Sequence, residues 1–516
     1  MGTQHVSYNG MEGLRDLSRD ILNRARLSRD ARFDGKFFIA VTTTRIYCRP
    51  VCPARASKHS HVRYFATAAE AAEAGFRPCL RCRPEAAPGS PAWTGTSVVV
   101  RRALRLIQSG ALDEGSVEEL ANRLGIGGRH LTRLFAQHVG ASPAAVAQTR
   151  RLHFAKRLLD DTQLSITEIA LASGFGSVRR FNDAFLDNYQ RSPSELRRRH
   201  SSTRGVECGT AEIILRLAYR PPYDWEHLEA FLSSRAIPGV DGADGEGYVR
   251  AVRTTSGYAV VRVRPVDESN ALELKIKGAQ PSDLMPLLSS VRRMFDLSAD
   301  PARIAVALGG DPLLRPLLQL RPGLRIPGVW EPFECLVRAI LSKQASIAAV
   351  RTRLGCLVQR LGQPIDTPEQ GVTHLFPGPD VIAKASLDDL GITSAQQNTL
   401  RLLARSVEEG SIRLDDPSDE LARTLAQLPG VGRWTAGYVA LRGFAEPDAF
   451  PYGDLKLRFQ AASHKRSLSA QELAARAARW RPFRGYAVLH LWEANAAARR
   501  LQSSGVREVN RATSEC

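Results

Sequence analysis

The stretch TTTRIYCRPVC, residues 42–52, contains two cysteines close together, and the stretch AGFRPCLRC, residues 74–82, contains two more. These four residues form a C-x3-C-x26-C-x2-C pattern made of Cys48, Cys52, Cys79 and Cys82. Two thiolate pairs joined by a loop can converge on one tetrahedral zinc ion, which stabilises domains that are too small to bury a sufficient core. The pattern predicts one zinc ion that holds the N-terminal region together.

The residues around the cysteines predict a small α+β domain over residues 1–86. Strand signals occur in KFFIAVTTTRIYC, residues 36–48, and a short helix is indicated by ATAAEAAEAGF, residues 66–76. Zinc bound by four thiolates is net negative, so an exposed ligand could act as a nucleophile toward an alkyl group, whereas a purely structural site needs shielded sulfurs. The spacing alone leaves both interpretations open.

The other four cysteines lie far apart in the sequence, at Cys208, Cys335, Cys356 and Cys516. Isolated cysteines do not form the disulfide framework of a secreted chain. The first residues show no basic-then-apolar signal pattern, and no apolar run reaches the roughly 18 residues of a membrane span. These observations predict a soluble protein of the reducing cytoplasm that has no membrane partner.

Length and charge divide the chain unevenly. At 516 residues it is long enough for about three domains. Residues 1–200 have a net charge of +13, whereas residues 201–516 have a net charge of +5. Such an excess attracts phosphate polymers through counterion release, although a solubilising surface can have the same composition. Together with the zinc pattern, the charge favours nucleic acid as the partner.

Two stretches rich in Pro, Gly, Ser or Arg indicate domain joints. They are PEAAPGSPAWTG, residues 84–95, and RRRHSSTRGVECGT, residues 197–210. The joints predict a second domain over residues 92–200 and a third over residues 211–505.

The two cysteine stretches closely resemble the zinc domain of the Ada family, which takes a methyl group from methylphosphotriesters in DNA. The resemblance implies that Cys48 is the methyl acceptor and that the zinc ion is both structural and catalytic. It also implies that Thr44, Arg55 and Arg77 contact the DNA backbone. The family has a further contact arginine directly after the second cysteine, where this chain has Pro53. The second methyltransferase motif of that family, Pro-Cys-His-Arg, is absent from the sequence.

The second predicted domain shows helical periodicity. Apolar positions recur every three or four residues in SVEELANRLGIGGRHLTRLFAQHVG, residues 116–140, and again in SITEIALASGFGSVRRFNDAFLDNYQ, residues 165–190. Each stretch combines a capping serine with a glycine turn before a second helix. These residues are Ser116 and Gly125 in the first stretch, and Ser165 and Gly174 in the second. The repeat predicts two helix-turn-helix units whose second helices enter the major groove of DNA.

The repeat, closed by RSPSELRRR at residues 191–199, resembles the all-α DNA-binding domain of AraC-type regulators. The predicted base or phosphate contacts are Arg129, His130, Arg133, Ser177, Arg179, Arg180 and Asn182. Spacing on the inward face of each second helix predicts a core made of Leu131, Leu134, Phe135, Phe181 and Phe185. A regulator of this type implies promoter DNA and RNA polymerase as partners.

The third predicted domain begins as α+β and continues as mainly α. Strand-like alternation occurs in EIILRLAY, residues 212–219, and in YAVVRVRPV, residues 258–266. The helical part contains LPGVGRWTAGY, residues 428–438, within a predicted hairpin over residues 423–443. Glycines at Gly430 and Gly432 allow the backbone to come close to a DNA phosphate, toward which the following helix directs its N-terminus. This grip is independent of DNA sequence.

The hairpin, followed by Asp454 in FPYGDLKLRF, resembles the helix-hairpin-helix DNA glycosylases, and in particular the AlkA family of 3-methyladenine-DNA glycosylases II. The similarity extends over the stretches YRPPYDWEHLEAFLSSRA (219–236), RPGLRIPG (321–328), PFECLVRAILSKQAS (332–346) and WRPFRGYAVLHLW (480–492). It implies that Asp454 is the catalytic carboxylate for hydrolytic release of bases such as 3-methyladenine. The competing interpretation of this aspartate is an ordinary helix cap.

The same resemblance implies a base pocket lined by aromatic side chains, whose faces attract a cationic base. These side chains are Phe231, Trp434, Tyr438 and Trp492. Gln344 corresponds to the wedge that fills the gap left by a flipped nucleotide, in a segment where Ser342 and Lys343 replace the family's more frequent Gly-Gln. Relatives that also cut the strand use a lysine where Trp434 stands, so we expect a monofunctional glycosylase. We expect no iron–sulfur cluster, because the sequence near the C-terminus has no set of four cysteines that could bind one.

The leading interpretation is therefore an adaptive response to DNA alkylation that combines methyl transfer to Cys48, regulation of transcription and base excision in one chain. Two alternatives remain. The first is a DNA-binding regulator whose glycosylase domain is catalytically silent. The second is a general nucleoid protein, which leaves the four cysteines without a role.

Overall fold

The computed structural model describes residues 18–88, 98–108, 110–113, 115–200, 212–266, 269–367, 369–388, 390–414, 418–462 and 467–494. The chain forms two compact units. The first comprises Met1–Pro221, Val249–Arg292 and Leu297–Ala299, and the second comprises Pro222–Tyr248, Arg293–Asp296 and Asp300–Cys516. Several parts of the sequence predictions lie outside the described residues. These parts are residues 1–17 of the first predicted domain, residues 495–505 of the third, most of both predicted joints, and the cysteines Cys208 and Cys516.

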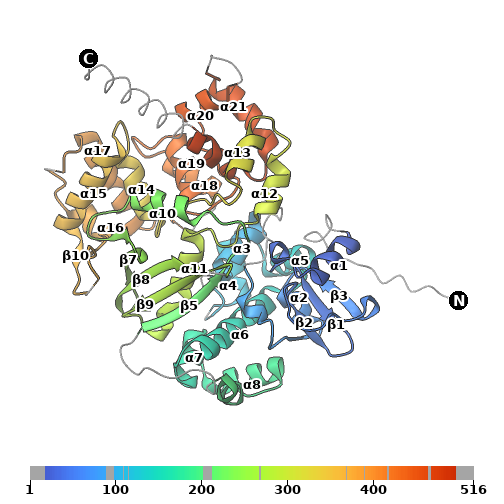
Figure 1. Ribbon diagram of the computed structural model, residues 1–516. Helices are drawn as coiled ribbons and strands as arrows, with labels where there is room; N and C mark the ends of the chain where they lie inside the picture. Colours follow the sequence, from blue (N-terminus) through green and yellow to red (C-terminus); the bar gives the residue numbers. More distant parts are fainter. Residues whose placement is uncertain are drawn as a thin grey trace, which may run out of the picture. The chain divides into compact units, whose positions relative to one another are not determined.

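The cysteine-rich region of the first unit is a small α+β domain, as predicted (Figure 1). Its elements are α1 (Arg19–Leu27), η1 (Ala31–Phe33), β1 (Phe38–Val41), β2 (Ile46–Cys48), η2 (His59–His61), β3 (Val62–Phe65), α2 (Ala68–Glu73), β4 (Arg77–Pro78) and η3 (Pro84–Ala86). The sheet has the order β3-β1-β2-β4. Because side chains of a strand alternate between faces, Phe38 and Ala40 pack in one apolar cluster and Ile39 in another.

Helices follow in the same unit (Figure 1). They are α3 (Val98–Gln108), α4 (Val117–Arg123), α5 (Gly128–His138), α6 (Pro143–Asp161), α7 (Ile166–Ala172), α8 (Val178–Tyr189) and α9 (Pro193–His200). Ser116 and Ser165 form capping boxes at the starts of α4 and α7. Gly125 and Gly174 have φ values of 71° and 77°, a backbone conformation that favours glycine. The predicted caps and turns of both helix-turn-helix units are thus confirmed.

The first unit also contains antiparallel strands. They are β5 (Glu212–Ala218), most of β7 (Gly247–Thr254), β8 (Gly257–Pro265) and β9 (Ala271–Lys277), and they are followed by η6 (Pro281–Asp283) and α11 (Leu284–Met294). In the order β5-β9-β8-β7, strand β9 pairs with β5 on one side and with β8 on the other. Leu274 of β9 lies opposite Leu215 and Val263, and all three are fully buried. The two predicted strands are confirmed.

The second unit is mainly helical, as predicted (Figure 1). Its elements are α10 (Trp225–Ser233), β6 (Asp241–Asp244), α12 (Pro301–Leu308), α13 (Leu314–Leu320), α14 (Pro332–Leu341), α15 (Ile347–Leu361), β10 (Gln363–Pro364), β11 (His374–Leu375), α16 (Pro379–Lys384), α17 (Ser394–Glu408), α18 (Ser418–Leu425), α19 (Arg433–Arg442), α20 (Leu455–Gln460), α21 (Ala470–Ala477) and η7 (Ala478–Trp480). Residues 484–494 are also helical. Every residue from Phe333 to Leu341 is buried. Helix α14 is thus the centre against which α15, α17 and α19 pack.

Candidate functional site

Pairing between β2 and β4 brings the two cysteine pairs together. The parallel register pairs Tyr47 with Pro78, and the backbone N–H of the next residue, Cys79, donates to the Tyr47 carbonyl at 2.9 Å. Cys48 follows Tyr47 directly, so it lies beside Cys79. A tight turn, in which the Cys52 N–H donates to the Arg49 carbonyl at 3.1 Å, returns Cys52 toward Cys48. Four residues from two distant stretches therefore form one cluster.

The cluster fits a zinc ion. All four Sγ atoms lie within 4.8 Å of one another, and sulfurs around a tetrahedral zinc ion are about 3.8 Å apart when each Zn–S bond is roughly 2.3 Å. Hydrogen bonding, first of all between Cys48 and Cys52, raises the pKa of Cys48 and lowers the pKa of Cys52 to about 7. Thiols this close cannot all hold a negative charge unless a cation lies among them. The donor set is therefore suited to zinc.

Accessibility distinguishes the cysteines within the cluster. Cys48 and Cys52 are half-buried, whereas Cys79 and Cys82 are buried. An electrophile can therefore approach the predicted acceptor more easily than the second pair. Of the predicted backbone contacts, Thr44 and Arg55 are exposed and Arg77 is half-buried.

Arg49 ties the cluster to the surrounding chain. Its backbone N–H donates to the Cys82 Sγ at 3.3 Å, and its guanidinium donates to the Cys82 carbonyl at 3.1 Å. The same guanidinium forms a bidentate ion pair with Asp34, in which Nε lies 2.8 Å from Oδ1. A backbone N–H that donates to a ligand sulfur stabilises its negative charge. Sequence reasoning missed this role because an arginine beside a cysteine has many possible partners.

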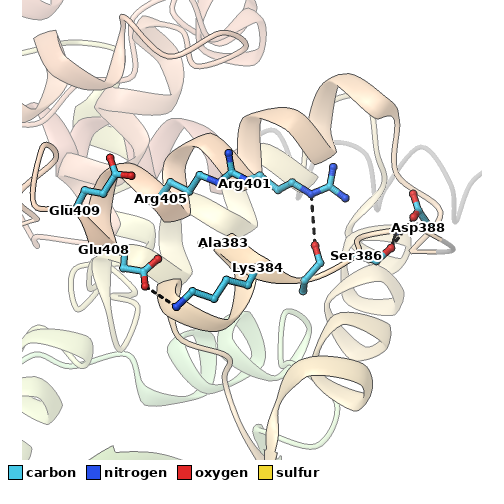
Figure 2. A pocket seen from close by; sticks show the side chains of 9 residues that line it. Ala383, Lys384, Ser386, Asp388, Arg401, Arg405, Glu408 and Glu409 are labelled. Carbon is cyan, nitrogen blue, oxygen red and sulfur yellow. Dashed lines mark hydrogen bonds and ion pairs between the residues drawn. The ribbon is translucent and has the colours of Figure 1, made fainter.

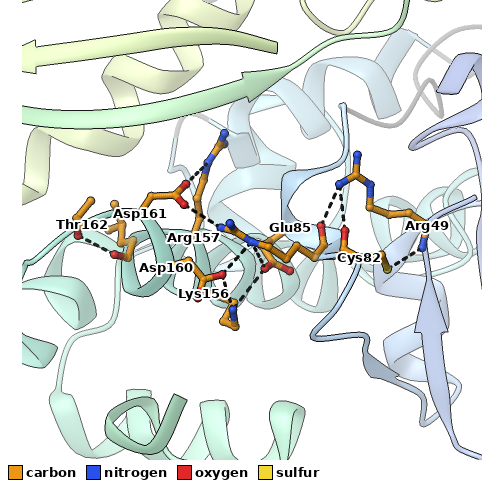
Figure 3. Close-up of polar contacts among 10 residues, drawn as sticks. Arg49, Cys82, Glu85, Lys156, Arg157, Asp160, Asp161 and Thr162 are labelled. Carbon is orange, nitrogen blue, oxygen red and sulfur yellow. Dashed lines mark hydrogen bonds and ion pairs between the residues drawn. The ribbon is translucent and has the colours of Figure 1, made fainter. Parts of the chain in front are cut away.

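A buried network of charged residues joins η3 to α6 (Figure 3). Lys156 Nζ lies 2.5 Å from Asp160 and 3.7 Å from Glu85, and these three side chains are at most 3% exposed. Arg83 pairs with Asp160 at 2.9 Å and with Asp161 at 3.1 Å. Burial raises the pKa of Glu85. The cysteine-rich region and the long helix α6 are therefore joined by buried charges.

In the helix-turn-helix region, the predicted DNA contacts and the predicted core residues differ in their exposure to solvent. Six of the predicted DNA contacts are exposed on α5 and α8, namely Arg129, His130, Arg133, Arg179, Arg180 and Asn182. Ser177, the seventh predicted contact, is half-buried and caps α8, because its hydroxyl accepts from the Arg180 N–H at 3.2 Å. The predicted core residues Leu131, Phe135, Phe181 and Phe185 are fully buried, and Leu134 is partly buried.

In the second unit, the hairpin brings an indole to the predicted catalytic carboxylate. Gly430 has a φ of 81°, and Gly432 is the N-cap of α19; both are exposed. Trp434, in the first turn of α19, donates from Nε1 to Asp454 Oδ2 at 2.9 Å. Asp454 is 8% exposed, and its Oδ1 accepts from the Leu457 N–H at 3.0 Å at the start of α20. The carboxylate is held by one bond to each oxygen.

Three of the four predicted pocket residues form a continuous aromatic group. Tyr438 stacks on Trp434 with ring centroids 5.1 Å apart and an interplanar angle of 18°. Trp492 lies 6.4 Å from Tyr438, measured between ring centroids. All three side chains are half-buried. Their stacking places an aromatic wall next to the Asp454 carboxylate.

Phe231, the fourth predicted pocket residue, is covered by arginines that sequence reasoning missed. The Arg235 guanidinium carbon lies 3.7 Å from the ring centroid, and that of Arg442 lies 4.9 Å away. Burial lowers the pKa of Arg235 to about 10. Arg442 also lies over the Tyr438 ring at 5.5 Å. A pattern of aromatic residues gives no signal for these cations, because Arg235 lies in the turn after α10 and Arg442 lies at the end of α19.

Gln344 is exposed in the turn between α14 and α15. Its φ is 54°, in the left-handed region that is uncommon for residues other than glycine. An exposed side chain on a turn with this backbone conformation fits the predicted wedge.

A separate open pocket of about 630 Å³ lies between α16 and α17 (Figure 2). Its lining includes side chains of both positive and negative charge, and Lys384 Nζ donates to Glu408 Oε1 at 2.8 Å. Arg401 Nε donates to the Ala385 carbonyl at 3.4 Å. None of the predicted site residues lines it.

Among the described residues, no helix has both the length and the apolar composition that a membrane crossing requires.

Three family models match consecutive parts of the chain. The metal binding domain of Ada matches residues 22–85, a helix-turn-helix domain matches residues 120–199, and the AlkA N-terminal domain matches residues 214–331. The first match contains the whole cysteine cluster, which confirms that the N-terminal part is Ada-like.

Relatives extend the similarity over almost the whole chain. A probable bifunctional transcriptional activator/DNA repair enzyme AlkA of Mycobacterium tuberculosis is 41% identical, covering 91% of this chain and 95% of the relative. DNA-3-methyladenine glycosylase 2 of Escherichia coli is 32% identical over 54% of this chain and 95% of its own length. The bifunctional activator Ada of Escherichia coli is 37% identical over 29% of this chain and 40% of its own length. The chain thus joins an Ada-like part to an AlkA-like part and belongs to the family of the bifunctional transcriptional activator/DNA repair enzyme AlkA.

Proposed function

We propose that the protein responds to DNA alkylation by accepting a methyl group on Cys48, by regulating transcription, and by excising alkylated bases at Asp454. The observation that carries the excision activity is the 2.9 Å hydrogen bond from Trp434 to Asp454, beside the Trp434–Tyr438 stack. It combines a buried, oriented carboxylate with a surface on which a flipped base can stack. The family membership supports both repair and regulation.

For methyl transfer, the Cys48 sulfur attacks the methyl carbon of a methylphosphotriester in DNA. The S–C bond forms while the C–O bond breaks, and the phosphate oxygen keeps the electron pair as a phosphodiester anion. One zinc ion, held by Cys48, Cys52, Cys79 and Cys82, would keep the sulfurs ionised. The product is a stable thioether, so each protein molecule reacts once. Thr44, Arg55 and Arg77 bind the DNA backbone around the lesion.

Methylation also changes how the protein binds DNA. Conversion of one thiolate to a neutral thioether removes one negative charge from the cluster, so DNA phosphates are repelled less. Helices α5 and α8 then engage promoter DNA through their exposed polar residues, and RNA polymerase is the partner in activation.

For excision, an alkylated purine such as 3-methyladenine leaves the duplex and stacks on the aromatic group, with Gln344 inserted in the gap. Water adds to C1′ of the deoxyribose while the C1′–N bond breaks, and the base leaves with the electron pair of that bond. Asp454 accepts a proton from the water and stabilises the positive charge that develops on the sugar. The product is an abasic site. The strand is not cut, because Trp434 occupies the position at which strand-cutting relatives have a lysine.

The excision activity is tested by comparing the wild-type protein with Asp454→Asn in an abasic-site assay on methylated duplex DNA. We expect the variant to lose release of 3-methyladenine by at least about 100-fold. Asp311→Asn is a matched control, because Asp311 also accepts from an indole, at 2.7 Å from Trp480 Nε1, but lies outside the predicted pocket. Equal release by wild type and Asp454→Asn would favour a regulator with a silent glycosylase domain.

The methyl acceptor is tested by mass spectrometry of the full chain after incubation with DNA that contains methylphosphotriesters. We expect one added methyl group, located on Cys48 and absent from Cys48→Ala. Cys356→Ala is the control, because Cys356 is an exposed cysteine outside the cluster. A methyl group that remains on the chain in Cys48→Ala would contradict the assignment.

A further inference from the structure

Arg442, at the end of α19, is buried beside the predicted base pocket. It is 3% exposed, and its Nε donates to the Pro327 carbonyl at 2.7 Å. Its Nη1 donates to the Tyr438 hydroxyl at 2.5 Å. One end of the guanidinium is therefore anchored on the backbone of another segment, and the other end fixes the Tyr438 side chain.

The contact with Tyr438 continues to the carboxylate. Tyr438 stacks on Trp434 at 5.1 Å, and Trp434 donates to Asp454 at 2.9 Å. Because the stack is nearly parallel, a rotation of the Tyr438 ring would displace the indole and with it the donor to Asp454 Oδ2. Arg442 thus reaches the predicted catalytic oxygen through two rings.

We propose that Arg442 is a positioning residue for base excision, which fixes the Tyr438–Trp434 stack and thereby the direction of the Asp454 carboxylate. The inference rests on the excision activity proposed above. Arg442 touches neither the base nor the water in this scheme, and its effect is transmitted by Tyr438. Misplacing a reacting group by about 1 Å through a distant change can lower a rate on the order of 100-fold.

The test measures single-turnover release of 3-methyladenine by Arg442→Met together with the dissociation constant for the same DNA. We expect the rate constant to fall by about 10- to 100-fold while the dissociation constant changes by less than about twofold. Arg442→Lys should recover only part of the rate, because an ammonium cannot reproduce the two fixed N–H directions of a guanidinium.

The matched control is Arg325→Met in the same unit. Arg325 is 1% exposed, donates to the Pro222 carbonyl at 2.8 Å, and lies over the ring of Tyr223, rather than that of Tyr438, at 4.8 Å. We expect Arg325→Met to lower thermal stability without changing the rate constant of the folded protein. A rate loss in Arg442→Met no larger than in this control would overturn the proposal.

A double-mutant cycle separates positioning from general damage. Tyr438→Phe removes the hydroxyl that accepts from Arg442 and keeps the ring, so its effect and that of Arg442→Met should not multiply in the double variant. Independent, multiplying effects would contradict the proposal. The indole N–H resonance of Trp434, assigned by Trp434→Phe, should shift in Arg442→Met and stay in place in Arg325→Met. This readout decides the coupling even if the wild type releases no base, an outcome that would reject the proposed function instead.

Discussion

At the scale of single residues, Asp454 is both a helix cap and a neighbour of the predicted base pocket. Its Oδ1 accepts from the Leu457 N–H and caps α20, while its Oδ2 accepts from Trp434. Each oxygen has a different partner, so the cap fixes the carboxylate without occupying the oxygen that faces the indole. The sequence pattern identifies the aspartate, but only the fold shows which oxygen is bound by the backbone.

The helix cap and the proposed catalytic role of Asp454 can be separated by substitution. We expect Asp454→Asn to keep the free energy of unfolding within about 0.5 kcal/mol of the wild type, because asparagine caps helices as well as aspartate. Asp454→Ala should lower it by about 1 kcal/mol through loss of the cap. Both variants should lose base release. Urea unfolding of the two variants, with the abasic-site assay alongside, checks the prediction, and equal stability of the two would contradict it.

His490 predicts a dependence of stability on pH. The residue is 4% exposed, and burial, reinforced by the neighbouring His227, lowers its pKa to about 4. Between about pH 6.5 and pH 4 the unfolded chain binds a proton at this position and the folded chain does not. The stability contribution is therefore complete above pH 6.5 and is lost as pH falls, by at most about 3 kcal/mol. In His490→Gln, the free energy of unfolding, measured by urea unfolding, should change less steeply with pH between about pH 4 and pH 6.5. An unchanged slope would contradict the contribution of His490.

At the scale of helices and strands, features set by neighbouring residues can be predicted from the sequence, whereas contacts between residues distant in the sequence cannot. Ser116 and Ser165 are recognisable because a capping box lies within four consecutive residues. Lys156 and Asp160 look in the sequence like an ordinary solvent-exposed pair one turn apart. The structure buries them because Glu85, some seventy positions earlier, packs against α6. Arg442 escapes prediction for the same reason, since its ring partner Phe231 is on α10.

The η3–α6 network predicts a large effect of one substitution. Lys156→Met should lower the free energy of unfolding of the first unit by about 3 kcal/mol, because it removes the buried cation shared by Glu85 and Asp160 and leaves only the partly exposed Arg83 to pair with them. Arg191→Met is the control, since Arg191 pairs with Glu195 while 31% exposed and should cost less than about 1 kcal/mol. Urea unfolding monitored by circular dichroism gives both values. A loss for Lys156→Met no greater than for the control would show that the network adds little.

At the scale of the whole molecule, the chain forms two units whose segments alternate along the sequence. Composition and joints predict three consecutive domains, and family models match three consecutive parts. The two compact units do not coincide with these three consecutive parts. Strands β8 and β9, for example, belong to the first unit although they follow α10 of the second unit in the sequence. Pairing of strands that are distant in sequence is not encoded in composition or in local periodicity.

Removal of zinc should affect the two units unequally. Structural zinc contributes on the order of 10 kcal/mol to folding of small domains, so a chelator should lower the unfolding temperature of the first unit by about 20 °C or more. The second unit, which lacks the cysteine cluster, should keep its unfolding temperature within about 2 °C. Differential scanning calorimetry with and without the chelator, and after zinc is restored, measures both transitions. Equal shifts in both units, or none, would contradict this expectation.

The charged contact between η3 and α6 also sets where this protein can be recombined. A chimaera that takes the cysteine-rich region from a relative and keeps the resident helix-turn-helix region would separate Glu85 and Arg83 from Lys156, Asp160 and Asp161. We expect an exchange of these regions to leave the protein stable only when both sides of the contact are carried together. We therefore expect a stable chimaera to have its crossover outside residues 83–161, and not at the Pro-rich joint within that range.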